Sequence, residues 1–213
     1  MIKIIKKPEP EFWRDFKKKY PKKTYNDLGK SEEGKELRAK IRDFMIKNQK
    51  GLCCYCCKSI DSDNSHNEHI KPRSVFHELS MEYQNIVVSC TTPAGKELSC
   101  GYAKCNKYDE SLFVSPLDDD CEKHFKFLPD GRILAKSEKG DYTIKLLNLW
   151  NPDLTKARKA HLKDCEKSAK LGKEFFYEYY IAENDGILPR FVDMVKFFYD
   201  DGYFDFDFNG KDD

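Results

Sequence analysis

Apolar residues recur at helical spacing in several stretches of the chain. Phe12, Trp13 and Phe16 predict a short helix after two prolines. A second helix is expected to begin near Ser31, because acidic residues follow in the first turn, and to run toward Gly51 with its apolar residues on one face. In the C-terminal half the same periodicity predicts helices over residues 142–149, 152–171, 175–182 and 191–199.

Extended segments lie between these helices. The pattern predicts a β-like run over residues 2–5, a strand over 65–69 that ends before Pro72, and a strand over 86–88. Residues 52–60 are expected to form a knuckle between two short strands, and residues 100–109 a helix. A Pro-Asp-Gly turn at 129–131 predicts a hairpin over residues 124–135.

The elements and the charge pattern predict an α+β protein of three segments. Residues 1–50 carry 16 Lys and Arg against 8 Asp and Glu and form a basic helical arm. Residues 51–110 hold the cysteine-rich core, and residues 111–213 combine the hairpin with an acidic helical region. Because phosphate backbones attract clustered cations, the lysines at 17–19, 22 and 23 are either a phosphate-binding surface or a solvated face, and the sequence favours neither.

Nine cysteines are an odd number, and seven of them lie between Cys53 and Cys105. A secreted disulfide protein normally shows an even, dispersed set after a signal peptide, and the N-terminus lacks the apolar run that a signal peptide requires. No segment has the roughly 18 apolar residues of a membrane span. We therefore expect a cytoplasmic protein, not bound to a membrane, with reduced, metal-binding thiols.

The spacing of these cysteines predicts a structural zinc site, since a tight turn supplies two thiolates two residues apart. In the first group the pairs Cys53/Cys56 and Cys54/Cys57 fit equally well. The second group offers three further candidates, which are Cys90, Cys100 and Cys105. Cys121 and Cys165 are expected to be ordinary buried thiols.

Between the two cysteine groups stand an acid–histidine pair, Glu68 and His69, and an asparagine, Asn85. A neutral imidazole can take a proton from water near pH 7, and a carboxylate can hold a hard divalent ion such as Mg²⁺ or Mn²⁺. Arg73 and Lys104 are plausible phosphate contacts. The arrangement indicates a hydrolytic centre held between metal-bound turns, which is typical of a nuclease.

The run Glu68-His69-Ile70-Lys71-Pro72, with Asn85-Ile86 and Cys100-x-x-x-Lys104 downstream, resembles the HNH endonuclease motif. The resemblance implies a core of two strands and one helix around a metal, the ββα-metal fold, with zinc knuckles. It implies that Glu68 is a ligand of the catalytic ion, that His69 is the general base and that Asn85 orients this base. For zinc it favours Cys53, Cys56, Cys90 and Cys100, and it places Lys104 at the family's lysine position.

The sequence departs from this motif at Gly101, where the family carries a metal-binding His or Asn directly after the last zinc cysteine. Asn106 is the expected replacement ligand. His66 is the alternative, and a shifted register that closes on Cys105-Asn106 is the third reading.

Flanking patterns, among them Met1-Ile2-Lys3-Ile4 and Leu147-Asn148-Leu149-x-Asn151-Pro152, are similar to those of the PtuB-like HNH proteins of Septu and retron antiphage systems. The resemblance implies DNA as the most plausible substrate and a PtuA-like ATPase as partner. It also implies, for some members, a retron reverse transcriptase with its noncoding RNA.

Two other functions fit the same residues. One is a zinc-knuckle module that binds nucleic acid or protein without chemistry, which Gly101 leaves open. The other is a nuclease that stays silent until a partner complex releases it. The aromatic residues of the C-terminal helices are expected to be core first, and their excess, with the acidic tail from Tyr203 to Phe208, suggests a docking face for the partner.

Overall fold

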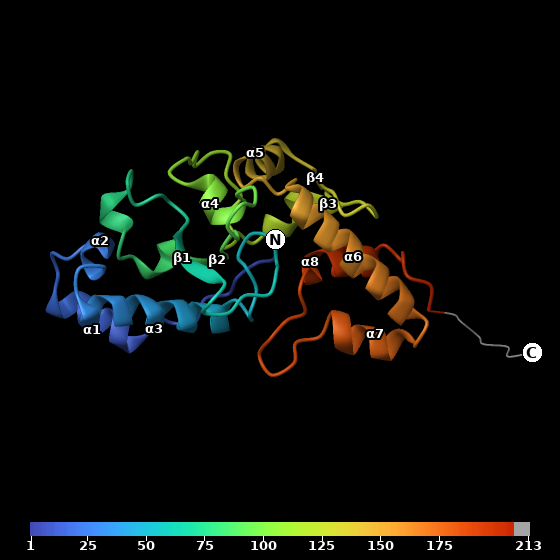
Figure 1. Ribbon diagram of the computed structural model, residues 1–213, viewed down its shortest axis with the longest axis horizontal. Coiled ribbons are helices and arrows are strands. Elements are labelled where there is room, and N and C mark those ends of the chain that lie inside the picture. The colour runs from blue at the N-terminus through green and yellow to red at the C-terminus, as the bar shows by residue number, and fades with distance from the viewer. Residues whose placement is uncertain (207–213) are drawn as a thin grey trace, which may run out of the picture.

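The computed structural model describes residues 1–206 and begins with three helices (Figure 1). These are α1 (Glu11–Lys19), α2 (Tyr25–Leu28) and α3 (Glu32–Asn48). Ser31 caps α3, because its side chain accepts a hydrogen bond from the backbone N–H of Gly34 at 3.2 Å. The two predicted helices are confirmed. The β-like run is wrong: residues 2–5 form no strand, and Ile4 instead donates to the carbonyl of Pro116.

Two antiparallel strands and a short helix form the centre of the molecule. β1 (Ser65–His69) pairs with β2 (Ile86–Cys90), with Ser65 opposite Cys90 and His69 opposite Ile86. Helix α4 (Cys100–Lys104) packs against β2. This arrangement is consistent with the expected ββα core. The knuckle before β1 holds a single bridge, Leu52 to Ser59, in place of two short strands.

Within residues 111–206 the chain forms a hairpin and four α-helices, and the last three of these helices lie toward the opposite end of the long axis from α1–α3 (Figure 1). The hairpin pairs β3 (Phe125–Phe127) with β4 (Ile133–Ala135). The helices are α5 (Glu138–Leu146), α6 (Pro152–Ala169), α7 (Lys173–Tyr180) and α8 (Val192–Asp200). All five predicted elements are confirmed, with boundaries shifted by a few residues. The end of the acidic tail, residues 207–213, lies outside the described residues.

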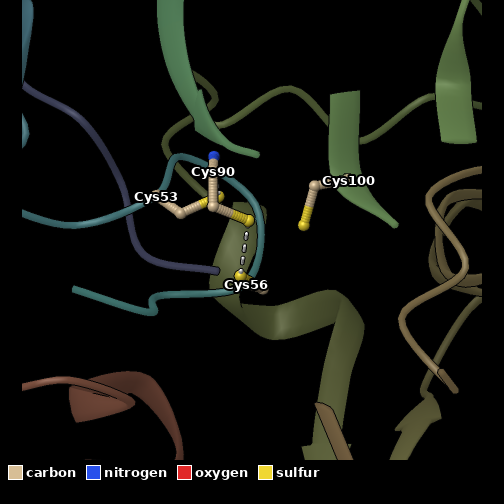
Figure 2. Close-up of side chains that lie close together, drawn as sticks. All are labelled: Cys53, Cys56, Cys90 and Cys100. Carbon is tan, nitrogen blue, oxygen red and sulfur yellow. Dashed lines mark hydrogen bonds between the residues drawn. The ribbon is translucent and has the colours of Figure 1, made fainter. Parts of the chain in front are cut away.

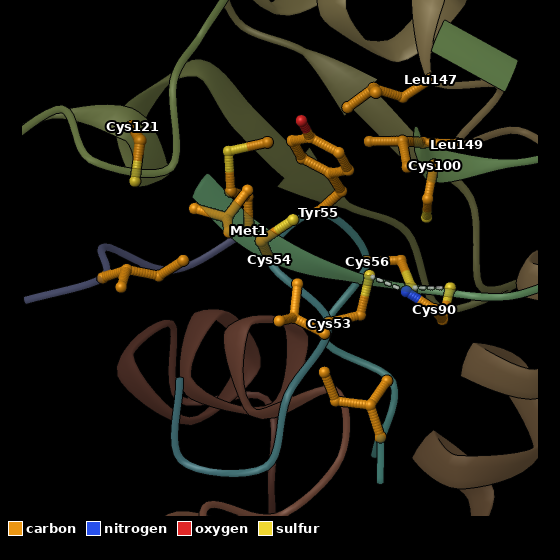
Figure 3. Close-up of a cluster of buried hydrophobic side chains, with 14 of the residues drawn as sticks. Met1, Cys53, Cys54, Tyr55, Cys56, Cys90, Cys100, Cys121, Leu147 and Leu149 are labelled. Carbon is orange, nitrogen blue, oxygen red and sulfur yellow. Dashed lines mark hydrogen bonds between the residues drawn. The ribbon is translucent and has the colours of Figure 1, made fainter. Parts of the chain in front are cut away.

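One continuous cluster of buried side chains connects these parts, from Met1 to Phe204. Figure 3 shows its centre, where knuckle and strand cysteines lie among Met1, Tyr55, Leu147 and Leu149. The cysteine-rich turn is therefore part of the hydrophobic core. The division at residues 50 and 110 stays a prediction. Within residues 1–206, no helix combines the length and the apolar character needed to cross a bilayer.

Candidate active site and metal centre

Four buried cysteines converge from three elements (Figure 2). Cys53 and Cys56 come from the knuckle, Cys90 ends β2 and Cys100 opens α4. The four Sγ atoms lie within 4.8 Å of one another, and those of Cys56 and Cys90 are 3.7 Å apart. Four thiolates around zinc at about 2.3 Å are separated by about 3.8 Å. The cluster therefore has nearly the dimensions of a tetrahedral zinc site.

The other five cysteines lie outside this cluster. Geometry resolves the overlapping pairs in favour of Cys53 and Cys56, because of the four knuckle thiols only these two belong to the cluster. Burial raises the pKa of the Cys54 and Cys57 thiols well above the usual range. Burial likewise raises the pKa of Cys121 and of Cys165 to about 12, as expected of ordinary buried thiols. Cys105 is exposed, and all nine cysteines are free of disulfides.

A cleft of about 250 Å³ opens between β1, α4 and the loop after β1. It brings together most of the residues expected to carry the chemistry, but not Asn85. The lining includes Glu68, His69, Arg73, Lys104 and Asn106, together with His66, Gly101 and Tyr102.

Glu68 is 8 % exposed and is held by three side chains. The Lys104 ammonium lies 2.7 Å from Oε1, which also accepts a hydrogen bond from the Tyr55 hydroxyl at 3.2 Å. The Nε2 atom of His66 lies 3.7 Å from Oε2. Burial opposes ionisation, but His66 and Lys104 outweigh it and hold the pKa of Glu68 below its usual value. Glu68 is thus an ionised carboxylate, the form that binds a cation.

The imidazole of His69 is buried and neutral. Burial lowers its pKa to about 4, so that it carries no charge near pH 7. Its Nε2 atom lies 2.9 Å from the carbonyl oxygen of Ser80. Because a carbonyl only accepts hydrogen bonds, Nε2 carries the ring proton and Nδ1 keeps its lone pair. The ring also packs edge-on against Tyr25, with centroids 4.7 Å apart.

The side-chain hydrogen bonds of Asn85 go to the loop after β1 and not to the imidazole of His69, and its role in orienting the base stays a prediction. Its Oδ1 accepts from the backbone N–H of Lys71 at 2.8 Å, and its Nδ2 donates to the carbonyls of Lys71 and Leu79. The asparagine therefore braces the two ends of the loop that carries Ser80. Sequence reasoning missed Ser80 because a backbone carbonyl has no side-chain signature.

The other residues expected to act in the site differ in their exposure and in the partners that hold them. Lys104 is 1 % exposed, and its ammonium binds Glu68 and the carbonyl of His69, so contact with a phosphate would require this pair to open. Arg73 stands at the rim with its guanidinium 5.0 Å from the ring centroid of Tyr25. Asn106 is exposed at the edge of the cleft.

Comparison with known proteins places this site in context. No family model matches the chain. It is 33 % identical over 132 residues to a candidate HNH endonuclease of retron Vc95 from Vibrio cholerae serotype O1 biovar El Tor. It is 27 % identical over 154 residues to the Septu protein PtuB of Bacillus mycoides strain KBAB4. The resemblance to HNH-like defence proteins is confirmed.

These HNH-like defence proteins match a little over half of the chain, 57 % for the Vibrio protein and 59 % for the Bacillus protein. The chain in turn spans 63 % and 52 % of their lengths. The likeness thus supports the family resemblance, and the activity and partners of the whole protein are matters for proposal.

Proposed function

We propose that the protein is a metal-dependent HNH endonuclease that hydrolyses phosphodiester bonds in DNA. The observation that carries this proposal is the shared cleft of Glu68 and His69, where an ionised carboxylate stands beside a neutral imidazole. These are the two states that cation binding and proton abstraction require.

In this proposal each residue has one task. His69 Nδ1 takes the proton of the attacking water, while the Ser80 carbonyl fixes the ring. Lys104 and Tyr55 orient Glu68, and Arg73 at the rim contacts the phosphate. A Mg²⁺ or Mn²⁺ ion bound by Glu68 would neutralise charge on the phosphate and on the leaving oxygen.

The four-cysteine cluster would hold zinc as a structural ion. Cys90 ends β2 and Cys100 opens α4, so the ion would fix the strand and helix that flank the cleft. Thiols kept reduced for a metal suit a cytoplasmic protein.

A plasmid-nicking assay tests the activity. Zinc-loaded wild type with Mn²⁺ or Mg²⁺ is expected to cut, and His69→Ala should be slower by about 10²- to 10⁴-fold, the usual contribution of a general base. His77→Ala is the matched control, because His77 is an exposed histidine outside the lining of the cleft. If His69→Ala cut as fast as wild type, the assignment of the base would be wrong.

The defence role is proposed from the relatives. We infer that the protein is the nuclease effector of an antiphage system and works with a PtuA-like ATPase, as the likeness to a Septu protein named PtuB suggests. Because the Vibrio relative is named as a retron protein, we propose a retron reverse transcriptase and its noncoding RNA as further partners. Co-expression with a cognate ATPase should yield a stable complex, and cleavage that appears only in this complex would identify the silent-nuclease variant of the proposal.

The non-catalytic alternative rests on the ion pair between Lys104 and Glu68, which satisfies one oxygen of the carboxylate without any cation. A zinc-knuckle binding module would bind DNA without cutting it, with or without the ATPase. The same assay separates the two, since only the nuclease distinguishes His69→Ala from His77→Ala.

A further inference from the structure

A second histidine stands beside the proposed catalytic carboxylate. His66 precedes Glu68 by two residues on β1, so both side chains lie on the same face of the strand. Its Nε2 atom lies 3.7 Å from Glu68 Oε2, which is too long for a direct hydrogen bond. Oε2 is also the oxygen that faces away from the Lys104 contact, because Lys104 and Tyr55 both bind Oε1.

Gly101 on α4 is shaped around these two atoms. A Cβ at this position would lie 2.7 Å from Glu68 Oε2 and 2.8 Å from His66 Nε2, closer than real Cβ contacts come. Its backbone φ is not in the left-handed region, so glycine is not required by conformation. A Cβ at position 101 would instead require the ends of the Glu68 and His66 side chains to shift.

The imidazole of His66 is held in place but incompletely bonded. Its ring stacks on Tyr102, with centroids 4.4 Å apart and planes at 15°. Its Nδ1 atom is buried and has no hydrogen-bond partner among residues 1–206. Imidazole nitrogen and carboxylate oxygen are both common metal ligands, and a cation between these two atoms would bind both.

We propose that His66 is a ligand of the divalent cation together with Glu68, and that Gly101 leaves the room for it. Nitrogen and oxygen ligands lie about 2.1 Å from a metal such as zinc, so two ligand atoms 3.7 Å apart can flank one ion. This inference deepens the proposed function and rests on it for the location of the ion.

The ligand set also sets the metal preference. Imidazole suits first-row transition ions, whereas Mg²⁺ prefers oxygen ligands and retains several waters. The site should therefore bind Mn²⁺ more tightly than Mg²⁺, and this selectivity should depend on His66.

Binding of Mn²⁺ alone, followed by electron paramagnetic resonance on the zinc-loaded full chain without DNA, tests the proposal. His66→Ala is expected to weaken Mn²⁺ binding at least about tenfold, a loss that even outer-shell partners of metal ligands produce. Affinity for Mg²⁺, measured by competition, should change much less. Glu68→Gln should also lose Mn²⁺, and His77→Ala should bind as wild type does.

A double variant, His66→Ala/Gly101→His, moves the imidazole from β1 to α4. Removal of the His66 ring relieves one of the two close approaches at position 101, and a small shift of the Glu68 carboxylate relieves the other. This variant should therefore recover Mn²⁺ affinity relative to His66→Ala. Zinc content and melting temperature check the fold, and His66→Gln serves as the substitute if the alanine variant loses zinc.

The proposal is overturned if His66→Ala, or its glutamine substitute, retains Mn²⁺ affinity within twofold, or if wild type binds no Mn²⁺ in the cleft. The first outcome is distinct from failure of the proposed function, whereas the second would also remove the ion on which that function depends. The role of His66 is tested by the Mn²⁺ and Mg²⁺ affinities, whereas the proposed nuclease activity is tested by the cleavage rates of wild type and His69→Ala.

Discussion

At the scale of single residues, His69 is positioned by a backbone carbonyl, and Asn85 contributes by bracing the loop that supplies it. Asn85→Ala would leave the N–H of Lys71 and the carbonyls of Lys71 and Leu79 without this partner. We expect a loss of about 2 kcal/mol in unfolding free energy, measured with urea. If Asn85 only oriented the imidazole, Asn85→Ala would lower the cleavage rate and change the free energy of unfolding by less than about 0.5 kcal/mol.

The sequence predicted the residues whose chemistry lies in their side chains. Glu68, His69 and the zinc-type cysteines belong to a spaced motif, and the structure brings them together. The sequence could not predict the burial of Lys104, because lysine is ordinarily solvated. It also could not predict which side chains lie against Gly101, because this depends on how β1 and α4 pack.

At the scale of elements, α2 and α3 meet at a glycine. A Cβ on Gly34 would lie 2.1 Å from the carbonyl oxygen of Leu28. Alanine is the better helix former, but the overlap should dominate, so Gly34→Ala is expected to destabilise the fold by about 1–3 kcal/mol.

Gly29→Ala is the matched control for this variant. A Cβ there approaches only the end of the flexible Arg38 side chain, at 3.0 Å, so the cost should stay below about 1 kcal/mol. The free energies of unfolding of Gly34→Ala and Gly29→Ala are compared by chemical denaturation. Equal values would mean that the contact between α2 and α3 adjusts to the added Cβ at little cost.

Helix α6 carries a histidine that should make stability depend on pH. His161 is 5 % exposed, packs against Tyr180 and Phe191, and accepts a hydrogen bond from Arg190. Burial lowers its pKa to about 4, against about 6.5 in an unfolded chain. The unfolded state therefore binds more protons between these values, and folding becomes less favourable as pH falls.

The contribution of His161 is measured by a substitution. For this shift, unfolding free energy should drop by about 2 kcal/mol between pH 7 and pH 5 through His161 alone. In His161→Gln the drop should be smaller by about this amount. An identical pH dependence in the two proteins would show that folding does not lower the pKa of His161.

Helices and strands could be predicted where the hydrophobic pattern is long, as for α3 and α6, or where the turn residues are specific, as for the hairpin of β3 and β4. Helix α2 is a single turn, too short for periodicity to reveal, although Thr24 and Asp27 form its capping box. Helix α4 ends early, at Cys105, where φ is 50°. Residues 2–5 have the β-like pattern but no strand beside them.

At the scale of the whole molecule, the metal cluster and the core are one structure. Cys53, Cys56, Cys90 and Cys100 belong to the cluster of buried residues that extends from Met1 to Phe204. Loss of zinc should therefore lower the stability of the entire fold rather than release one module.

Cys56→Ser tests this coupling. It should lose bound zinc and melt in one transition at a temperature lower by about 10 °C or more, followed by circular dichroism and by tryptophan fluorescence. Cys105→Ser, which alters an exposed thiol outside the cluster, should keep zinc and melting temperature unchanged. Two separate transitions in Cys56→Ser would show that the knuckle folds independently.

The central claim is that a thiolate-bound scaffold holds Glu68 and His69 around a divalent cation. Anomalous diffraction from a zinc-loaded crystal soaked in Mn²⁺ tests it most directly. The account predicts zinc among the four cysteine sulfurs and Mn²⁺ within about 2.2 Å of Glu68 Oε2, in the cleft beside His69. A Mn²⁺-free cleft at saturating ion, with zinc in place and Glu68 bound only to its protein partners, would contradict it.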